Sequence, residues 1–265
     1  MTVFLLLLLS SLVLGISLFS LRLLLVIHHT HARSSPPPRR QHDAPASLAI
    51  FLGSGGHTAE MMRLISGLDW QRYSKRVWII SSGDQLSESK ALALEKQIGT
   101  GSVRSCFPKF PALAKSLLGQ FTLLRIPRAR RVHQSYLTSP FTTLYSFAYC
   151  LWHISLAPLL PNPGPSGRRV FADLILLNGP GSCVPIAVSA FLPRLVALPS
   201  PSLIYIESLA RTRRLSVSAK LVRPLVDRFF VQWEALRDAL REGDAKRKVG
   251  AWRLKAAVEW EGWLV

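Results

Sequence analysis

The sequence predicts an α/β protein with one Rossmann-like parallel sheet, preceded by a single transmembrane helix. Apolar runs of strand length alternate with segments of helical periodicity, the pattern of a parallel sheet covered by helices. Two of these runs end in glycine-rich turns that lead into helices, at Gly53–Gly56 and Gly179–Gly181. Residues 2–27 form an apolar stretch long enough to cross a bilayer.

The composition indicates an anionic partner. The 265 residues include 33 basic and 15 acidic side chains, a formal net charge of +18 at pH 7. Such an excess favours nucleic acid, an anionic membrane surface or a phosphate-bearing substrate. With 49% hydrophobic residues the chain is not a disordered basic tail, and it can form a core. Its three cysteines lack metal-site spacing, and we expect buried, reduced thiols at Cys106, Cys150 and Cys183.

The N-terminal stretch is expected to be a permanent anchor. Residues 2–21 carry no charge, and apolar residues continue to Ile27. No basic residue precedes the stretch and no small-x-small site follows it, so a cleaved signal peptide is disfavoured. Arg33, Arg39 and Arg40 follow it, and the positive-inside rule then places the rest of the chain in the cytosol.

Four segments are expected along the chain. They are the anchor at 2–27, a Pro- and Arg-rich linker at 28–46, a Rossmann-like domain at 47–233, and a charged segment with an apolar tail at 234–265. The linker should be stiff because it contains consecutive prolines. Six apolar runs are expected to form strands: Leu48–Leu52, Val77–Ile80, Phe121–Ile126, Ala172–Leu177, Ser202–Ile206 and Phe229–Val231.

An aromatic helix is expected at Ser139–Leu160, and two environments fit it. The segment has no Asp, Glu, Lys or Arg, so it either belongs to the core or lies at a membrane interface. Its hydroxyl residues, together with His153 and Pro158, disfavour a second membrane span.

The turn after the first strand is a candidate anion site. Its glycines allow another molecule to approach the backbone, and the N-terminus of the following helix favours a phosphate or sugar phosphate. A tight turn without a ligand is the alternative. A P-loop is excluded because no lysine follows the last glycine. Thr58 stands where a dinucleotide fingerprint has its third glycine, so no NAD or ATP is expected, nor any other cofactor.

Three polar residues, His57, Asn178 and Glu207, follow apolar strands directly. The carboxyl ends of parallel strands share one edge of the sheet, where ligands bind. Structural roles are equally open: His57 could bond its own loop, and Glu207 could pair with Arg211 or Arg213. No metal site is expected, because the spacing of His57 and Glu60 supplies only two ligands.

Basic residues cluster at 128–131, 211–214 and 246–248. Each cluster could be ordinary solvated surface. Beside a membrane anchor, they together suggest contact with anionic headgroups or a lipid diphosphate. Nucleic acid is not expected as a partner, because the chain has no recognisable reading motif.

Several blocks of sequence resemble one known family. They are GSGGHT after the first strand, IPRARRVHQSYLTSPFTTLYS, LNGPGSCVP, and IYIESLARTRRLSVSAKLVRPLVDRFFVQW. In this order they resemble the membrane-anchor subunit of the endoplasmic-reticulum N-acetylglucosaminyltransferase, the fourteenth member of the asparagine-linked glycosylation series, in its fungal form. The resemblance extends from Ala49 to Gln232 and includes the single N-terminal span.

The resemblance implies half of a GT-B glycosyltransferase. This half would be the acceptor-binding domain, and a separate soluble subunit would bind UDP-GlcNAc and form a heterodimer with it. Together they would add the second GlcNAc to dolichyl-diphosphate-GlcNAc on the cytosolic face of the endoplasmic reticulum. The implied location is this membrane, with the nuclear envelope also admitted. The chain ends too soon after Val231 to hold a second nucleotide-binding domain, which agrees with a split enzyme.

Candidate residues follow from the strand ends and the resemblance together. His57 and Glu207 are the candidates for the base or for orienting the acceptor, and the sequence does not decide between them. The expected acceptor-binding residues are Gly53, Ser54, Gly55, Gly56, Thr58, Asn178, Gly179, Gly181, Arg211 and Arg213.

The apolar ending of the chain is a candidate partner surface. We expect Trp260, Trp263, Leu264 and Val265 to dock on the soluble subunit, as the resemblance implies, or on their own domain. Two other functions stay open. One is a self-sufficient membrane glycosyltransferase, and the other is a non-catalytic basic scaffold.

Overall fold

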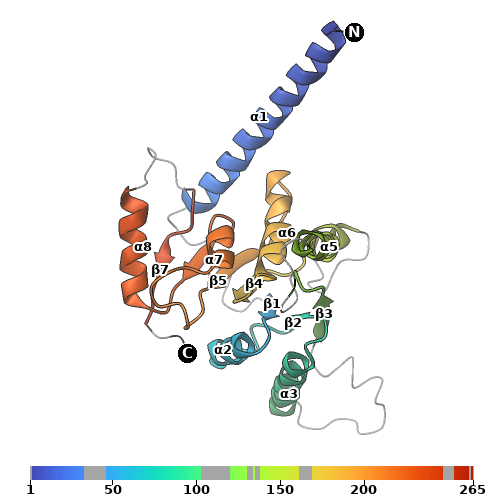
Figure 1. The fold of residues 1–265 in the computed structure, drawn as a ribbon. Helices are drawn as coiled ribbons and strands as arrows, with labels where there is room; N and C mark the ends of the chain where they lie inside the picture. The colour runs from blue at the N-terminus through green and yellow to red at the C-terminus, as the bar shows by residue number, and fades with distance from the viewer. Residues whose placement is uncertain are drawn as a thin grey trace.

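A computed structural model describes residues 2–32, 46–102, 120–129, 134, 138–160, 169–246, 254–262 and 264. Its core is a seven-stranded sheet in which every neighbouring pair is parallel (Figure 1). The strands are β1 (Ser47–Leu52), β2 (Lys75–Ser81), β3 (Gln120–Ile126), β4 (Leu174–Asn178), β5 (Ser202–Ile206), β6 (Arg228–Phe230) and β7 (Val258–Glu259). The predicted α/β fold with a single parallel sheet is therefore confirmed.

The strand order is β3-β2-β1-β4-β5-β6-β7, so the direction of winding reverses between β1 and β4. At such a reversal, the loops that leave the two central strands diverge and open a crevice at their carboxyl ends. Both glycine-rich turns follow these two strands. The order alone thus places the two turns side by side.

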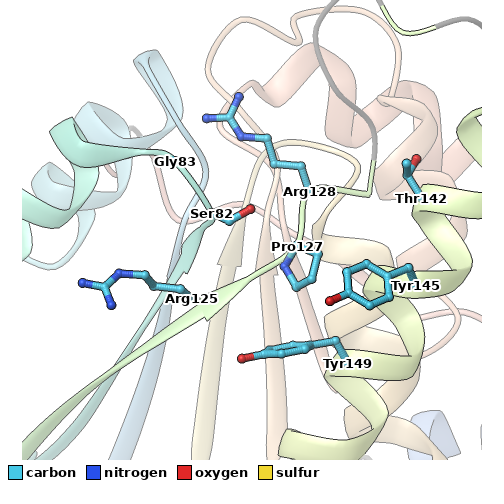
Figure 2. Close-up of a pocket in the computed structure, with 8 residues that line it drawn as sticks. All are labelled: Ser82, Gly83, Arg125, Pro127, Arg128, Thr142, Tyr145 and Tyr149. Carbon is cyan, nitrogen blue, oxygen red and sulfur yellow. The ribbon is translucent and has the colours of Figure 1, made fainter.

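Helices cover both faces of the sheet. In Figure 1, α2 and α3 lie on one side, and α5, α6 and α7 lie on the other. Figure 2 shows α5 directing Tyr145 and Tyr149 toward the end of β3 near Pro127. The helices are α1 (Thr2–Ala32), α2 (Gly56–Leu64), α3 (Gln85–Ser102), α5 (Ser139–Cys150), α6 (Cys183–Leu195), α7 (Val217–Val222) and α8 (Glu234–Lys246). The chain continues from α5 as the π-helix η1 (Leu151–Leu156) and the 3-10 turn η2 (Ala157–Leu159).

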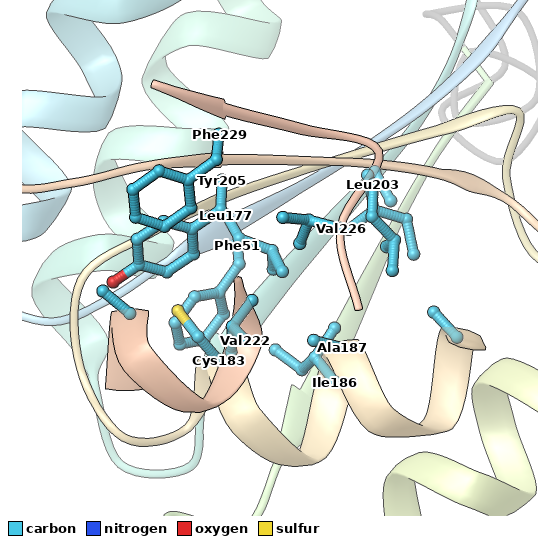
Figure 3. Close-up of a cluster of buried hydrophobic side chains, with 14 of the residues drawn as sticks. Phe51, Leu177, Cys183, Ile186, Ala187, Leu203, Tyr205, Val222, Val226 and Phe229 are labelled. Atoms are coloured by element: carbon cyan, nitrogen blue, oxygen red, sulfur yellow. The ribbon is translucent and has the colours of Figure 1, made fainter. Parts of the chain in front are cut away.

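Two apolar clusters separate the sheet from its helices. Figure 3 shows the larger one, in which β4 and β5 meet α6 and α7. Within it the rings of Tyr205 and Phe229 stack with centroids 5.4 Å apart. The second cluster joins the other face of β1 and β2 to α2. Because both faces are covered, β1 is buried along its whole length, as its unbroken apolar run predicts.

A buried ion pair fixes α3 to β2. Arg76 donates two hydrogen bonds of 2.7 Å to Glu95, and the Trp78 indole donates a third of 2.8 Å to the same carboxylate. The two charged side chains are only 4% and 2% exposed. A carboxylate at this depth is tolerated because all three donors converge on it.

The apolar helix α1 is long enough to cross a membrane, and its lower end packs on the domain. Val26 and Ile27 contact Phe191 of α6, and Arg22 Nε donates to the Leu195 carbonyl at 2.9 Å. The helix continues past Ile27, where we expected it to end, to Ala32. Its last turn contacts the domain through His31, whose Nε2 lies 3.0 Å from the Pro224 carbonyl, so the expected linker at 28–46 begins as helix. The domain therefore lies directly at the base of α1.

Two of the three cysteines are buried thiols, as predicted. Cys150 and Cys183 are free and fully covered. Burial raises the pKa of Cys150 to about 12 and raises the pKa of Cys183 well above its usual value, the latter with a smaller effect of the nearby Glu207 charge. Cys106 lies outside the described residues.

The sheet extends beyond residue 233, where we expected the domain to end. β7 pairs with β6, and Val231 N donates to the Glu259 carbonyl at 3.0 Å. Val258 is buried in the larger core, while Trp260 packs against that core and is partly exposed. The first part of the tail therefore docks on its own domain. Leu264 is half-buried, and Trp263 and Val265 lie outside the described residues.

Breaking the Arg76–Glu95 pair should destabilise the fold strongly. We expect Arg76→Met to lower the free energy of unfolding by about 3–5 kcal/mol, because Glu95 is left buried without its counter-charge. Lys246→Ala removes a charge from an exposed pair with Glu242 and should cost less than about 1 kcal/mol. Urea unfolding of the full chain in detergent measures both. If the two substitutions lowered the free energy of unfolding equally, a structural role for the buried pair would be contradicted.

Candidate functional site

The two glycine-rich turns are in contact, and their glycines allow that contact. A Cβ on Gly53 would lie 2.4 Å from the Pro180 ring, and a Cβ on Gly179 would lie 2.5 Å from the His57 ring. Gly179 also has a φ of +107°, and Gly55, which precedes α2, has a φ of +64°. Both conformations disfavour other residues. The turns after β1 and β4 thus form one surface with His57 held against it.

His57 is oriented by Asn178. Its Nδ1 donates to Asn178 Oδ1 across 3.1 Å, and Asn178 is fully buried at the end of β4. With the proton on Nδ1 in this bond, Nε2 is the ring nitrogen that can accept one. The His57 side chain is 34% exposed, so a ligand can reach the ring, and a Glu60 carboxylate oxygen lies 4.0 Å from Nδ1. The prediction that these two strand ends meet is correct.

Glu207 lies nearby, but its carboxylate is hydrogen-bonded to the loop between β5 and α7. It is 1% exposed, and its oxygens accept from Ser208 N at 3.1 Å and from Ser216 N at 3.0 Å. The Ser216 hydroxyl, which caps α7, donates to it as well. The ion pair with Arg211 or Arg213 that we considered is not formed. Both oxygens are already engaged, so Glu207 fixes the loop between β5 and α7.

Glu60 does similar work, and sequence reasoning missed it. This α2 residue is 9% exposed and accepts from Leu209 N at 2.7 Å and from the Ser208 hydroxyl at 3.0 Å. The Gln232 amide also donates to it. Two buried carboxylates therefore bind the loop that begins at residue 207, Glu60 at its start and Glu207 at both ends.

This loop carries exposed arginines above a small pocket. Arg211, Arg213 and Arg214 are exposed and form no ion pair within the described part of the chain. The pocket has a volume of about 220 Å³ and lies between the β4 turn and this loop. Its lining residues are His57, Gly179, Pro180, Glu207, Ser208, Ala210, Arg211, Ser216 and Ser218. It joins an imidazole to positive charge, a combination suited to a phosphorylated sugar.

Not all the predicted site residues line this pocket. Thr58 is fully buried, and its hydroxyl lies 2.6 Å from the Ser87 hydroxyl, so it holds α2 against α3. Gly53 is buried against Pro180. Ser54, Gly55 and Gly56 are accessible at the start of α2, where the first backbone amides lack helical partners.

Comparison with known proteins identifies relatives that match most of the chain. A family model described as "Oligosaccharide biosynthesis protein Alg14 like" matches residues 48–248. The chain is 39% identical over 217 residues to the UDP-N-acetylglucosamine transferase subunit ALG14 of Cryptococcus neoformans, which covers 82% of this chain and 86% of that protein. It is 41% identical over 215 residues to the Candida albicans subunit of the same name, covering 81% and 83%. The subunit of this name in Mus musculus is 37% identical over 191 residues, covering 72% and 77%.

Gly179 and Gly181 should respond differently to the same substitution. Gly179→Ala forces a side chain into a positive φ and against the His57 ring, so we expect unfolding to become easier by about 1–3 kcal/mol. Gly181→Ala meets no atom within 4 Å and should be nearly neutral. Thermal or urea unfolding of both full-length variants measures the difference. A destabilising Gly181→Ala together with a neutral Gly179→Ala would contradict the close contact of the two turns.

Proposed function

The chain belongs to the Alg14 family of oligosaccharide biosynthesis proteins, and from this premise we propose that it is the membrane-anchored, acceptor-binding subunit of a two-chain N-acetylglucosaminyltransferase. Its acceptor would be dolichyl-diphosphate-GlcNAc, to which the second GlcNAc is added in the synthesis of N-linked glycan precursors. The donor, UDP-GlcNAc, would be bound by a soluble partner subunit. The site would face the cytosol at the endoplasmic-reticulum membrane.

One observation carries this proposal. His57 and Arg211, the latter from the loop after β5, line one pocket at the point where the winding of the sheet reverses. This is where α/β proteins bind ligands, and the domain is joined directly to an apolar helix. A sugar diphosphate on a lipid fits all three features: a hydroxyl for the imidazole, a diphosphate for the arginines and a tail for the membrane.

The proposed chemistry needs a base and a held leaving group. The acceptor hydroxyl attacks the anomeric carbon of UDP-GlcNAc, and the bond from that carbon to UDP breaks. His57 Nε2 takes the hydroxyl proton, while Asn178 keeps the ring in the required tautomer. Arg211 and Arg213 would bind the acceptor diphosphate. We assign Glu207 a positioning role, because both its oxygens hold the arginine loop.

We assign the donor site to another chain. A GT-B enzyme places donor and acceptor on two facing domains, and the described strands here belong to a single sheet. In our proposal the partner supplies the missing domain and stabilises the charge that leaves with UDP. The heterodimer would then be the active unit.

Reconstitution tests the proposal directly. Purified full chain is mixed with UDP-GlcNAc and the lipid acceptor, with and without the soluble partner. We expect transfer only when both chains are present. Transfer by this chain alone would establish a self-sufficient enzyme instead. If His57→Gln leaves the rate of the reconstituted pair unchanged, the chain acts as a scaffold.

The pH profile should report the His57–Asn178 contact. We expect Asn178→Asp to move the acidic limb of kcat/KM upward by about one pH unit or more. A carboxylate beside Nδ1 favours the charged imidazolium, so the base stays protonated to higher pH. His57→Gln should remove this limb and lower kcat by about 10²–10⁴-fold. An unshifted limb in a folded Asn178→Asp variant would exclude His57 as the base.

The last residues should be needed for the partner and not for the fold. A chain ending at Gly262 keeps β7 and Trp260, whose ring lies 5.0 Å from the Arg237 guanidinium. We expect it to stay folded and membrane-bound but to lose co-purification of the partner and all transfer. A chain ending at Ala257 also loses the buried Val258 and should be destabilised. If the complex stays intact after the shorter deletion, the partner docks elsewhere, and the exposed sheet edge is then the expected surface.

A further inference from the structure

The helix α5 and its continuation η1 are amphipathic, but they expose their apolar face and turn their polar face toward the domain. Its exposed apolar side chains recur at helical spacing and form what we call the α5 stripe: Phe141, Leu144, Tyr145, Trp152 and Leu156. Phe141 is 75% exposed and Leu144 65%. A helix on the surface of a soluble domain normally presents its polar face to water. The stripe is therefore unfavourable in water, at roughly 25 cal/mol per Å² of apolar surface.

The polar residues of the same helix point inward. The Ser146 hydroxyl donates to the Pro127 carbonyl at 2.7 Å, and the Thr143 hydroxyl donates to the Ala129 carbonyl at 3.0 Å. On η1, Ser155 donates to the Ser189 carbonyl of α6. The inward polar face is thus satisfied by hydrogen bonds to its neighbours, and the outward apolar face is left for another partner.

The position of this helix favours the bilayer as that partner. α5 and η1 both pack on α6, and the C-terminal part of α6 contacts the base of α1. Figure 1 shows these helices on one side of the sheet, with α1 rising from that side. The exposed apolar run of α1 ends at Leu24, at the level where Arg22 contacts Leu195. The membrane surface that α1 enters is thus on the side of the molecule where the stripe is exposed.

An open pocket of about 750 Å³ lies between α5 and the ends of β2 and β3. We call it the Arg128 pocket, and its lining is Ser82, Gly83, Arg125, Pro127, Arg128, Thr142, Tyr145 and Tyr149 (Figure 2). Arg125 is already paired with Glu88, whose pKa the guanidinium lowers. Arg128 has no ion pair in the described structure, and its buried Nε donates to no protein atom. Its positive charge is therefore available to a ligand, and Figure 2 shows the Tyr145 and Tyr149 rings on the other side of Pro127 from its guanidinium.

We propose that the α5 stripe lies in the headgroup layer of the bilayer that α1 enters, and that the Arg128 pocket binds the phosphate of a lipid in that layer. The arginine supplies a charge-assisted donor for phosphate, and the tyrosines cover the start of an acyl or isoprenoid chain. The proposal depends on α1 crossing a membrane and does not depend on the transferase activity. Either can fail without the other.

A fluorophore tests the membrane contact. An environment-sensitive label is attached to Leu144→Cys in the full chain, in a Cys106→Ser background, after reconstitution into phosphatidylcholine–phosphatidylinositol vesicles. The buried Cys150 and Cys183 should not compete for the label, because burial raises their pKa. We expect a quencher located inside the bilayer to quench the label. Iodide, which stays in the water, should not quench it. The control is Leu86→Cys on α3, an exposed leucine on the other side of the sheet, where iodide should quench. Equal iodide quenching at both sites overturns the membrane contact.

Native mass spectrometry of the detergent-solubilised full chain tests the phosphate site. Farnesyl diphosphate, phosphatidylinositol and inorganic diphosphate are titrated separately. We expect Arg128→Gln to weaken binding of lipid phosphate about tenfold, while Arg63→Gln, an exposed and unpaired arginine of α2, changes it little. A loss confined to farnesyl diphosphate assigns the pocket to an isoprenoid lipid, and a loss shared with phosphatidylinositol assigns it to membrane phospholipid. Unchanged binding in Arg128→Gln, or wild-type binding of inorganic diphosphate as tight as that of the lipids, overturns the assignment.

Discussion

The burial of two carboxylates, Glu60 and Glu207, is the constraint on which the candidate site depends. A carboxylate in a protein interior is costly unless its oxygens are hydrogen-bonded. Here three of the six donors are backbone amides of one loop, at Ser208, Leu209 and Ser216, and two more are hydroxyls of that loop. The need to satisfy the two charges therefore gives the loop between β5 and α7 a defined shape. The loop in turn brings Arg211 to the pocket that His57 lines and exposes Arg213 and Arg214 beside it in sequence.

The basic excess of the chain consists of two populations of arginine. Some are used within the fold: Arg76, Arg194 and Arg223 each pair with a carboxylate while themselves 4%, 12% and 5% exposed. These arginines connect elements distant in sequence and contribute stability. Others form no ion pair in the described structure, and among these Arg128 and the arginines at 211–214 follow the carboxyl ends of β3 and β5. These arginines place part of the positive charge of the chain at the edge at which a ligand would bind.

Six strands were predictable because a parallel strand covered on both faces is a continuous apolar run. β7 was not, since it has two residues and only Val258 of the pair is buried. The meeting of His57 and Asn178 followed from strand ends that share an edge. The role of Glu60 did not, because its partners Leu209 and Gln232 lie 149 and 172 residues away along the chain. Local pattern does not distinguish such a glutamate from a solvated one.

The segment at 139–160 shows why the core and interface alternatives could not be separated by sequence. The sequence shows that the helix carries both apolar and hydroxyl residues. It does not show which of the two sets faces the domain. The available carbonyls decide it: Pro127, Ala129 and Ser189 present oxygens that need donors, and hydroxyls supply them. Because the hydroxyl residues occupy the inward face, aromatic residues such as Phe141 and Tyr145 face outward. Because α1 leaves the domain on this side, a surface unfavourable in water becomes favourable beside a bilayer. In our proposal the membrane then completes the packing of this outer helical layer.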